Sequence, residues 1–186
     1  MEIINNKIYQ NKRAGLYFHT ESDVFVENNE IIENKNANVI MKEKSRVKMV
    51  HNYIARSIGS GLVILTGSGC IFDNNVIESC MNNGIDLCNG DIYASKNIII
   101  DNERSGLYGN GHIKGYFQMN KVIGNKLQSW NNGLCKYIMD QDGSKNSSMH
   151  AVKNISKERF VMYRNIDDCE LKSLDYVQKH MNNGTA

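Results

Sequence analysis

Hydrophobic and polar positions repeat along the chain with a period of 22 or 23 residues. One column of the repeat is asparagine throughout: Asn6, Asn29, Asn52, Asn75, Asn97 and Asn120. Two residues after each asparagine stands an aliphatic residue: Ile8, Ile31, Ile54, Ile77, Ile99 or Val122. A period of about 20 to 50 residues is typical of folds in which each unit stacks on its neighbour. The chain is therefore expected to be a stack of similar units.

Each unit contains two further columns that predict turns. Five residues after the asparagines come mostly small polar residues: Asn11, Asn34, Ser57, Cys80, Asn102 and Asn125. Nine residues after them come Gly15, Asn38, Gly61, Gly84 and Gly106. Glycine and asparagine are the residue types most tolerant of positive φ, so this last column predicts a turn in the left-handed region.

The apolar residues between these columns predict three short strands in each unit. One strand carries the aliphatic column named above, and a second follows the glycine column with Leu16, Val39, Leu62, Ile85 and Leu107. A third, preceding each asparagine, alternates as in Val24 and Val26 or Val47 and Met49. Side chains alternate across a strand, so these columns point inward and stack about 4.8 Å apart. The predicted fold is all-β, a right-handed single-stranded parallel β-helix of about six coils.

Two features of the composition fit this fold. Asparagine is abundant before residue 126, and it can form a hydrogen-bonded ladder at a recurrent turn. Proline is absent, as expected where it would delete a ladder donor. A leucine-rich repeat would require a helical segment in each unit, and a left-handed β-helix would show six-residue repeats. Neither pattern is present.

The register fails after residue 126, which predicts a boundary. Residues 1–126 are expected to form the β-helix repeats, and residues 127–186 an irregular C-terminal cap. Within the cap a helix is predicted near residues 167–182, because Leu171, Leu174, Val177 and Met181 share one helical face. This helix, together with Trp130, is expected to cover the end of the solenoid.

The first coil has no comparable cap, since Glu2, Ile3 and Ile4 already lie in the regular repeat. An open coil exposes strand edges and core residues. We therefore expect a protein partner, or the remainder of a longer chain, to dock on the N-terminal coil.

Charge and cysteine content narrow the function classes. The formal net charge is +2, so no strong attraction to nucleic acid or to a bilayer is expected. The basic patch of Lys42, Lys44, Arg46 and Lys48 is interrupted by Glu43, which makes nucleic-acid binding an unfavoured interpretation. Five cysteines without a CxxC pair predict a cytoplasmic or other reducing compartment. No apolar run is long enough for a membrane helix, and no metal or cofactor is expected.

The pattern NNxI, then asparagine, then GLYF or GLVI resembles the pectate-lyase-like superfamily of right-handed parallel β-helix proteins over residues 1 to about 126. This superfamily includes pectate lyases, polygalacturonases, alginate epimerases and NosD-like proteins. It also includes the binding versions in F-box-only and Shc-SH2-binding proteins, and the regular coils are nearest in style to the NosD-like, F-box-only and Shc-SH2-binding groups. The resemblance is specific for fold and leaves function open.

In carbohydrate-active members of this superfamily the active site lies on the outward face of the strand after the glycine column. The outward positions here are Tyr17, Ile40, Val63, Asp86 and Tyr108, and then His19, Lys42, Leu65, Cys88 and Asn110. Glycoside hydrolysis needs two carboxylates about 5 to 9.5 Å apart, and Asp86 is the one acid in both columns. Arg104, in the turn before Tyr108, is the cation nearest to it. A lone aspartate near an arginine is more typical of a solvated ion pair, so no catalytic residue is assigned.

The strand before the asparagine column carries a second outward stripe of Phe25, Ile71, Tyr93 and Tyr116, interrupted by Lys48. Such a stripe can bind protein or stack on sugar rings, or its large side chains can simply stack on one another. The predicted function is a non-catalytic scaffold or binding module, a subunit or fragment of a larger assembly, with polysaccharide as a further ligand class. The binding residues are expected to be Tyr17, Phe25, Ile71, Tyr93, Tyr108, Tyr116, Asp86 and Arg104. The alternative is a polysaccharide lyase or epimerase that acts on uronic-acid polymers through Asp86 and Arg104.

Overall fold

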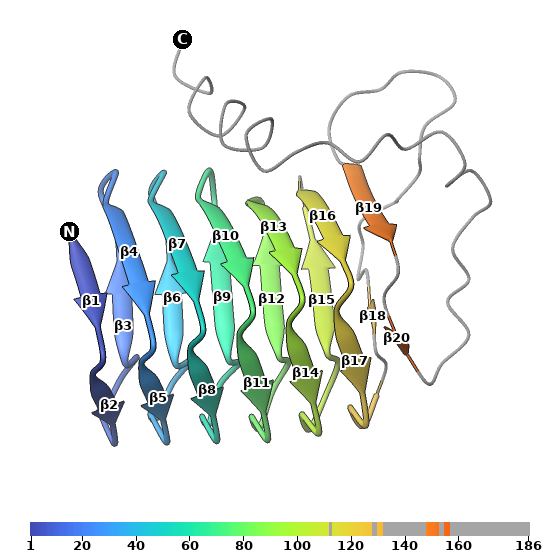
Figure 1. The fold of residues 1–186 in the computed structure, drawn as a ribbon, viewed down its shortest axis with the longest axis horizontal. Coiled ribbons are helices and arrows are strands. Elements are labelled where there is room, and N and C mark those ends of the chain that lie inside the picture. The colour runs from blue at the N-terminus through green and yellow to red at the C-terminus, as the bar shows by residue number, and fades with distance from the viewer. Residues whose placement is uncertain (112, 128–129, 132–147, 153–154, 157–186) are drawn as a thin grey trace, which may run out of the picture.

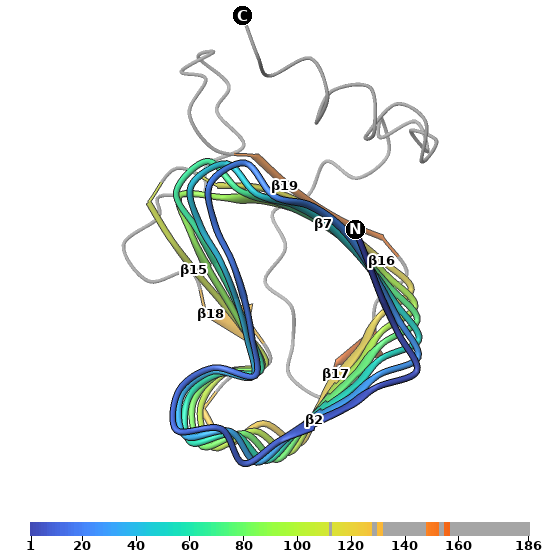
Figure 2. The same cartoon turned by 90° about the vertical axis from the view of Figure 1, so that its left-hand side faces the viewer.

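The computed structural model describes residues 1–111, 113–127, 130–131, 148–152 and 155–156. These residues form three parallel sheets that stack into a solenoid (Figure 1). Seen along the stack, successive coils superpose around a common interior (Figure 2). The predicted all-β parallel solenoid is therefore confirmed, and no helix occurs in this part of the chain.

The strands follow one another in the order sheet A, sheet B, sheet C within each coil. Sheet A contains β1 (Glu2–Ile4), β4 (Asp23–Glu27), β7 (Arg46–Val50), β10 (Gly69–Asp73), β13 (Asp91–Ser95), β16 (Lys114–Gln118) and β19 (Ser148–Val152). Sheet B contains β2 (Lys7–Tyr9), β5 (Glu30–Ile32), β8 (Tyr53–Ala55), β11 (Val76–Glu78), β14 (Ile98–Ile100), β17 (Lys121–Ile123) and β20 (Ile155–Ser156). Sheet C contains β3 (Leu16–Phe18), β6 (Val39–Met41), β9 (Leu62–Leu65), β12 (Ile85–Cys88), β15 (Leu107–Asn110) and β18 (Trp130–Asn131).

The pairing register joins equivalent positions of successive repeats. Ile31 pairs with Ile8 on one side and Ile54 on the other, and Ile77 pairs with Ile54 and Ile99. These inward isoleucines are fully buried from Ile31 to Ile99. The aliphatic column predicted from the sequence is therefore the core of the solenoid.

Beyond residue 126 three strands continue the sheets. Trp130, expected in the cap, lies in β18 and pairs with Leu107. β19 and β20 add to sheets A and B. The predicted helix near residues 167–182 lies outside the described residues, and the division of the chain at residue 126 stays a prediction.

The asparagine column forms the predicted ladder at the corner between sheets A and B. The backbone N–H of Asn29 donates to Oδ1 of Asn52 at 3.0 Å, and that of Asn52 donates to Oδ1 of Asn75 at 2.8 Å. The side-chain amides add carbonyl contacts, such as Asn75 Nδ2 to the carbonyl oxygen of Met49 at 2.9 Å. The ladder thus satisfies buried backbone groups that no strand pairing reaches.

The glycine column is not left-handed, which corrects the sequence-based expectation. Gly15, Gly61 and Gly84 are absent from the positive-φ residues of the described chain. Glycine is required there for close approach, because a Cβ on Gly84 would lie 2.5 Å from Ile99 Cγ2 and 2.6 Å from the carbonyl oxygen of Gly106. The left-handed residues lie at strand ends instead, and they include Asn28 at φ 53° and His51 at φ 56°.

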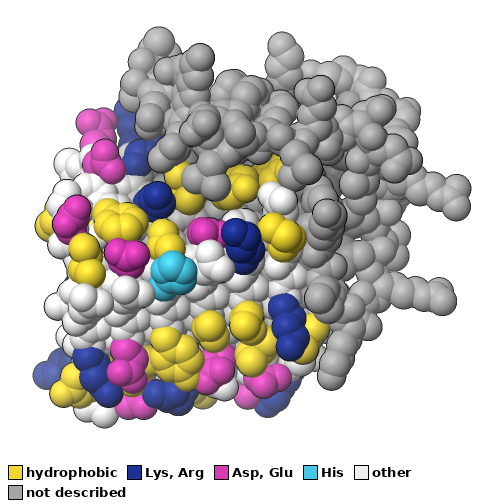
Figure 3. Space-filling model, in the orientation of Figure 1, with side chains coloured by type: hydrophobic (Ala, Val, Ile, Leu, Met, Phe, Trp, Pro, Cys, Tyr) yellow, Lys and Arg dark blue, Asp and Glu magenta, His cyan; other side chains and the backbone are white. Residues whose placement is uncertain are grey.

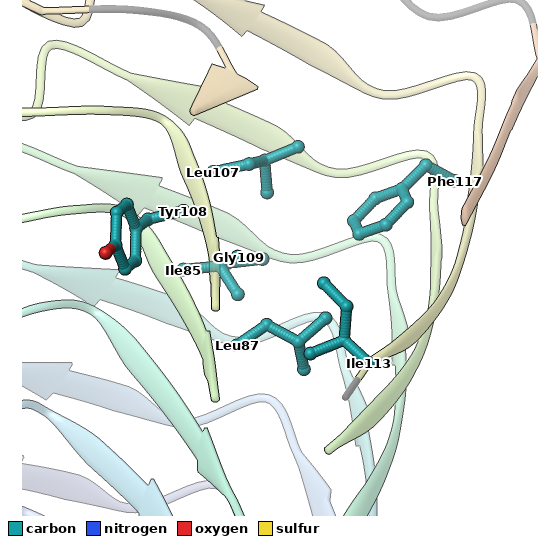
Figure 4. A pocket seen from close by; sticks show the side chains of 7 residues that line it. All are labelled: Ile85, Leu87, Leu107, Tyr108, Gly109, Ile113 and Phe117. Atoms are coloured by element: carbon teal, nitrogen blue, oxygen red, sulfur yellow. The ribbon is translucent and has the colours of Figure 1, made fainter. Parts of the chain in front are cut away.

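One inward column of sheet C has a glycine, Gly109, in place of a large side chain. Gly109 pairs with Leu87 at an inward position of sheet C, so it leaves a space that larger residues fill in earlier coils. Ile113 enters this space, and a Cβ on Gly109 would meet its Cδ1 at 2.7 Å. What remains is a cavity of about 10 Å³ bordered by apolar side chains (Figure 4). It is too small and too apolar to hold a ligand.

Candidate functional site

The outer face of sheet C brings three predicted site residues into one column. Tyr17 leads the column, and the register continues through Ile40 and Val63 to Asp86 and Tyr108. Because parallel strands lie about 4.8 Å apart, Asp86 and Tyr108 are immediate neighbours, whereas Tyr17 lies three coils from Asp86. The column is thus an extended face and not a closed pocket.

Asp86 is held by two polar side chains of its own corner. Ser60 Oγ donates to its Oδ2, and Asn83 Nδ2 donates to its Oδ1 at 2.7 Å. Burial raises the pKa of the Asp86 carboxyl, while these hydrogen bonds and the charge of Arg104 act in the opposite direction. Both carboxylate oxygens therefore accept hydrogen bonds from the protein, one from the preceding coil and one from the same coil. Neither Ser60 nor Asn83 was identified as a partner from the sequence.

The charge of Arg104 is close enough to lower the pKa of Asp86, but the two side chains do not form an ion pair within the described coils. Its Nη1 instead donates to Oδ1 of Asn82, in the preceding coil, at 3.4 Å. The predicted solvated ion pair is therefore replaced by a longer-range attraction. Arg104 is exposed at the turn that precedes Tyr108.

No second acid stands beside Asp86 in the described part of sheet C. Its column neighbours are Val63 and Tyr108, and the next outward column has Leu65, Cys88 and Asn110 at the same coils. No group of three or more potential metal ligands occurs among the described residues. The described face therefore lacks both the carboxylate pair of a glycosidase and a preformed cation site.

Tyr17 stands in a polar cluster at the N-terminal end of this face. Tyr17 is 50% exposed. Lys42 Nζ lies 5.5 Å from the centroid of the Tyr17 ring, and the centroids of the Tyr17 and His19 rings are 5.7 Å apart. Lys42 also pairs with Glu43 at 2.6 Å, and this contact, with a smaller effect of Tyr17, raises the pKa of the Lys42 ammonium. The cluster offers an aromatic ring and a cation to a ligand from solvent.

The outward stripe on sheet A has the predicted register, but two of its central side chains are buried. Phe25, Lys48, Ile71, Tyr93 and Tyr116 pair in succession. Ile71 is only 6% exposed and Tyr93 only 4%. The Tyr93 and Tyr116 rings stack at 5.1 Å with 3° between their planes, and Lys48 Nζ lies 5.6 Å from the Phe25 ring centroid. Stacking of large residues along the sheet accounts for these contacts.

Sheet B carries a polar network that sequence reasoning missed. Glu33 accepts hydrogen bonds from Gln10 at 3.2 Å and from Arg56 at 3.1 Å, while Arg56 Nη1 donates to Tyr53 Oη at 3.1 Å. The Tyr53 hydroxyl in turn donates to Glu78. The 23-residue spacing of Gln10, Glu33 and Arg56 is the signal that could have revealed it. Each charge has a partner within the network, so it ties four coils together.

Two lysines of the basic patch near the second coil form ion pairs with glutamates. Lys42 pairs with Glu43, and Lys44 Nζ lies 3.7 Å from Glu21. The face formed by sheets A and B mixes both signs of charge with apolar side chains (Figure 3). On this described face, basic side chains therefore alternate with acidic and apolar ones and do not form a continuous basic surface.

Fold and surface together define a β-solenoid that offers extended sheet faces. The sequence model described as "Right handed beta helix region" matches residues 1–149, and the chain belongs to this family. The handedness and the resemblance inferred from the repeat are thereby confirmed.

Solved structures with this fold include the periplasmic alginate epimerase AlgG, which is similar to this chain with 17% identity and a TM-score of 0.71. A single-substitution variant of the same enzyme has 18% identity and a TM-score of 0.68. Both matches cover 83% of this chain and 39% of the enzyme. No curated protein sequence matches significantly. At this identity the likeness shows the fold.

The expected cytoplasmic or other reducing compartment is wrong on this comparison, because the similar solved structures are of a periplasmic enzyme. The physical reason lies in the thiols. Cys70 and Cys80 are buried free cysteines, and burial raises the pKa of both thiols. Such thiols are protected from oxidation, so an odd cysteine count does not require a reducing compartment. In the described residues no helix has the length and hydrophobicity to span a membrane.

Proposed function

We propose that this chain is a non-catalytic β-helix scaffold or binding module within a larger assembly. The observation that carries the proposal is the state of Asp86. Its carboxylate is bound by Ser60 and Asn83, and the adjacent outward positions hold Val63 and Tyr108. A general acid or base must lie within hydrogen-bond distance of the substrate proton, and a displacement needs a second group on the opposite side, which neither Val63 nor Tyr108 supplies as a carboxylate.

The ligand face in this proposal is the outer surface of sheet C, and the ligand is an extended anionic polysaccharide. Exposed Tyr17 supplies a ring on which a sugar can stack, and the ammonium of Lys42 lies over the same ring. The fold is shared with an enzyme named for its action on alginate, a uronic-acid polymer. An extracellular or periplasmic location follows as part of the same proposal.

The second candidate is an epimerase or lyase that acts on uronic-acid polymers. It is favoured by the fold shared with the alginate epimerase and by the raised pKa of Asp86 beside Arg104. A raised carboxyl pKa is typical of general acids, but it also follows from burial alone.

Binding and turnover of alginate and other uronic-acid polymers separate the two candidates. The binding module should retain polymer without changing its composition or length. Tyr17→Ala should weaken retention about tenfold, the loss expected for one aromatic contact. Tyr9→Ala on sheet B is the matched control, because Tyr9 is also 50% exposed and has Lys7 Nζ 5.7 Å from its ring centroid. Turnover by the native chain that is abolished by Asp86→Asn would overturn the proposal and establish the enzyme.

A further inference from the structure

An exposed histidine lies beside the aromatic ring of the proposed ligand face. His19 directly follows β3, and the centroids of its ring and the Tyr17 ring are 5.7 Å apart. β3 and β6 are neighbours in sheet C, so the turn after β3 packs against the turn after β6 (Figure 1). The backbone N–H of Glu21 donates to the carbonyl oxygen of Glu43 at 2.9 Å, which holds the two turns in register. Side chains from both turns therefore meet around one exposed ring.

The hydrogen bonds of Thr20 fix the tautomer of the His19 ring. Thr20 Oγ1 donates to Oε2 of Glu43 at 3.2 Å and lies 2.7 Å from Nδ1 of His19. The contact with Lys42 holds the pKa of Glu43 below its usual range, and Thr20 and His19 act in the same direction. Glu43 is thus a carboxylate that only accepts, and the single hydroxyl proton of Thr20 is used on it. Nδ1 of His19 must therefore carry a proton and donate to Thr20.

The other ring nitrogen of His19 is the one open to a ligand. Nε2 has no hydrogen-bond partner among the described residues, and the His19 side chain is exposed. With Nδ1 already protonated, Nε2 is the nitrogen that gains a proton when the imidazole becomes charged. Protonation therefore creates a charged donor beside the Tyr17 ring.

The side-chain charges around His19 cancel one another. The charged side chains of the two turns and of the strand ends that follow them are Glu21, Asp23, Lys42, Glu43, Lys44 and Arg46. Lys42 pairs with Glu43 at 2.6 Å, and Lys44 pairs with Glu21 at 3.7 Å. Asp23 and Arg46 occupy paired positions of sheet A. While the imidazole is neutral, these side chains have no net charge with which to attract an anion, so the balance depends on His19.

We propose that His19 binds a uronate carboxylate of the polysaccharide through its protonated Nε2, next to the sugar ring that stacks on Tyr17. The inference rests on the proposed function and adds its regulation, because binding then strengthens as the pH falls. An imidazole ordinarily changes charge between about pH 5 and pH 8, whereas an ordinary carboxylate stays ionised above about pH 5. In the acid half of this range the ligand is an anion and His19 is a cation.

Retention of alginate at about pH 8 and about pH 5.5 tests the inference. The native chain should bind alginate about tenfold more tightly at the lower pH, the gain expected for one charge-assisted hydrogen bond. His19→Gln should bind equally at both pH values, with the native affinity at pH 8. His51→Gln is the matched control, because His51 lies at the corner between sheets A and B, and it should keep the native pH dependence.

The outcomes separate this inference from the proposed function. Native retention that is equal at the two pH values, or a pH dependence that persists in His19→Gln, would overturn the inference alone. Absence of alginate retention at both pH values would overturn the proposed function and the inference together. Urea midpoints of His19→Gln and the native chain should agree, since the side chain is exposed.

The hydrogen-bond chain is tested without a ligand. Nitrogen-15 chemical shifts of the His19 ring at about pH 8 should place the proton on Nδ1. Thr20→Val keeps the shape of the side chain and removes the hydroxyl, so it should release this preference. A native ring protonated on Nε2 at this pH would overturn the inference, because Nε2 would then be a donor before the ring is charged.

Discussion

The two corners of sheet B solve the same hydrogen-bonding problem in different ways. The ladder between sheets A and B is asparagine in all six repeats, whereas the ladder between sheets B and C is interrupted by Ser57 and Cys80. At the interruption, Asn38 occupies the column that is otherwise glycine. Its Oδ1 accepts from Asn34 Nδ2 at 2.8 Å, and its Nδ2 donates to the carbonyl oxygen of Ala55 at 2.9 Å.

Asn38 therefore replaces the amide that Ser57 cannot provide. In the regular coil, Asn125 Nδ2 donates to the carbonyl oxygen of Ile123, two residues earlier, at 3.3 Å. The equivalent acceptor before Ser57 is Ala55, and Asn38 reaches it from the neighbouring coil. A glycine is needed where the next coil has a ladder asparagine, because a Cβ on Gly15 would lie 2.6 Å from Asn34 Nδ2. At Ser57, the amide of the ladder is thus supplied from another position in the sequence.

The largest effect is expected from breaking the continuous ladder. Asn75→Ala removes the acceptor of Asn52 N at 2.8 Å and of Asn52 Nδ2 at 2.9 Å, and the donor to two carbonyls. Loss of these four hydrogen bonds, one of them to the buried backbone N–H of Asn52, should lower the free energy of unfolding by about 4 kcal/mol. Urea denaturation measures it. Ser57→Ala in the interrupted ladder is the control, and an equal loss there would remove the distinction between the corners.

A smaller effect is expected from filling the glycine column where the next coil has a ladder asparagine. A Cβ at Gly84 would meet the carbonyl oxygen of Gly106 at 2.6 Å and Asn102 Nδ2 at 3.0 Å. Gly84→Ala should therefore cost about 3 kcal/mol through displacement of the neighbouring coil. The urea midpoint reports this cost. A neutral result would mean that the coils can separate freely, against the close-approach explanation.

The compensation itself can be tested by moving the amide back. Asn38→Gly leaves Asn34 Nδ2 without its acceptor and removes one of two hydrogen bonds to the Ala55 carbonyl, which keeps the N–H of Glu33 at 3.0 Å. This change should cost about 2 kcal/mol. Adding Ser57→Asn to this variant rebuilds the regular ladder and should restore most of the loss. The two urea midpoints are compared directly. If Ser57→Asn gives no recovery, Asn38 does not act as a substitute for the ladder residue.

The smallest effect concerns pH at the same interrupted corner. Burial raises the pKa of Asp86, so its contribution to stability is full below the unfolded-state pKa and is lost as pH rises through the folded-state pKa. Asp86→Asn removes this titration. The variant should therefore gain stability relative to the native chain as the pH rises from about 4 through the folded-state pKa of Asp86. Urea midpoints across this range provide the measurement, and parallel curves would contradict the raised pKa.

Much of the fold was predictable because each coil contacts only its neighbours at a constant spacing. Ile31, Ile54 and Ile77 stack as expected. The site was less predictable. The register placed Asp86 beside Tyr108, but the hydrogen bonds from Ser60 and Asn83 depend on how the turn between sheets B and C packs. The repeat also placed Ile71 and Tyr93 at outward positions, but it did not predict that both side chains are buried.

The amino-acid sequence by itself determined the repeat, its three strands and the column in which each side chain stands. These follow from local alternation and from a fixed period, which any stack must obey. Only the tertiary structure decided which polar groups find partners and which are left over. Whether Asn38 can serve Asn34, or whether Asn6 Oδ1 has a donor, depends on atoms brought together from different coils. Hydrogen bonds of this kind are decided by distances of a few tenths of an ångström, which a periodic pattern does not encode.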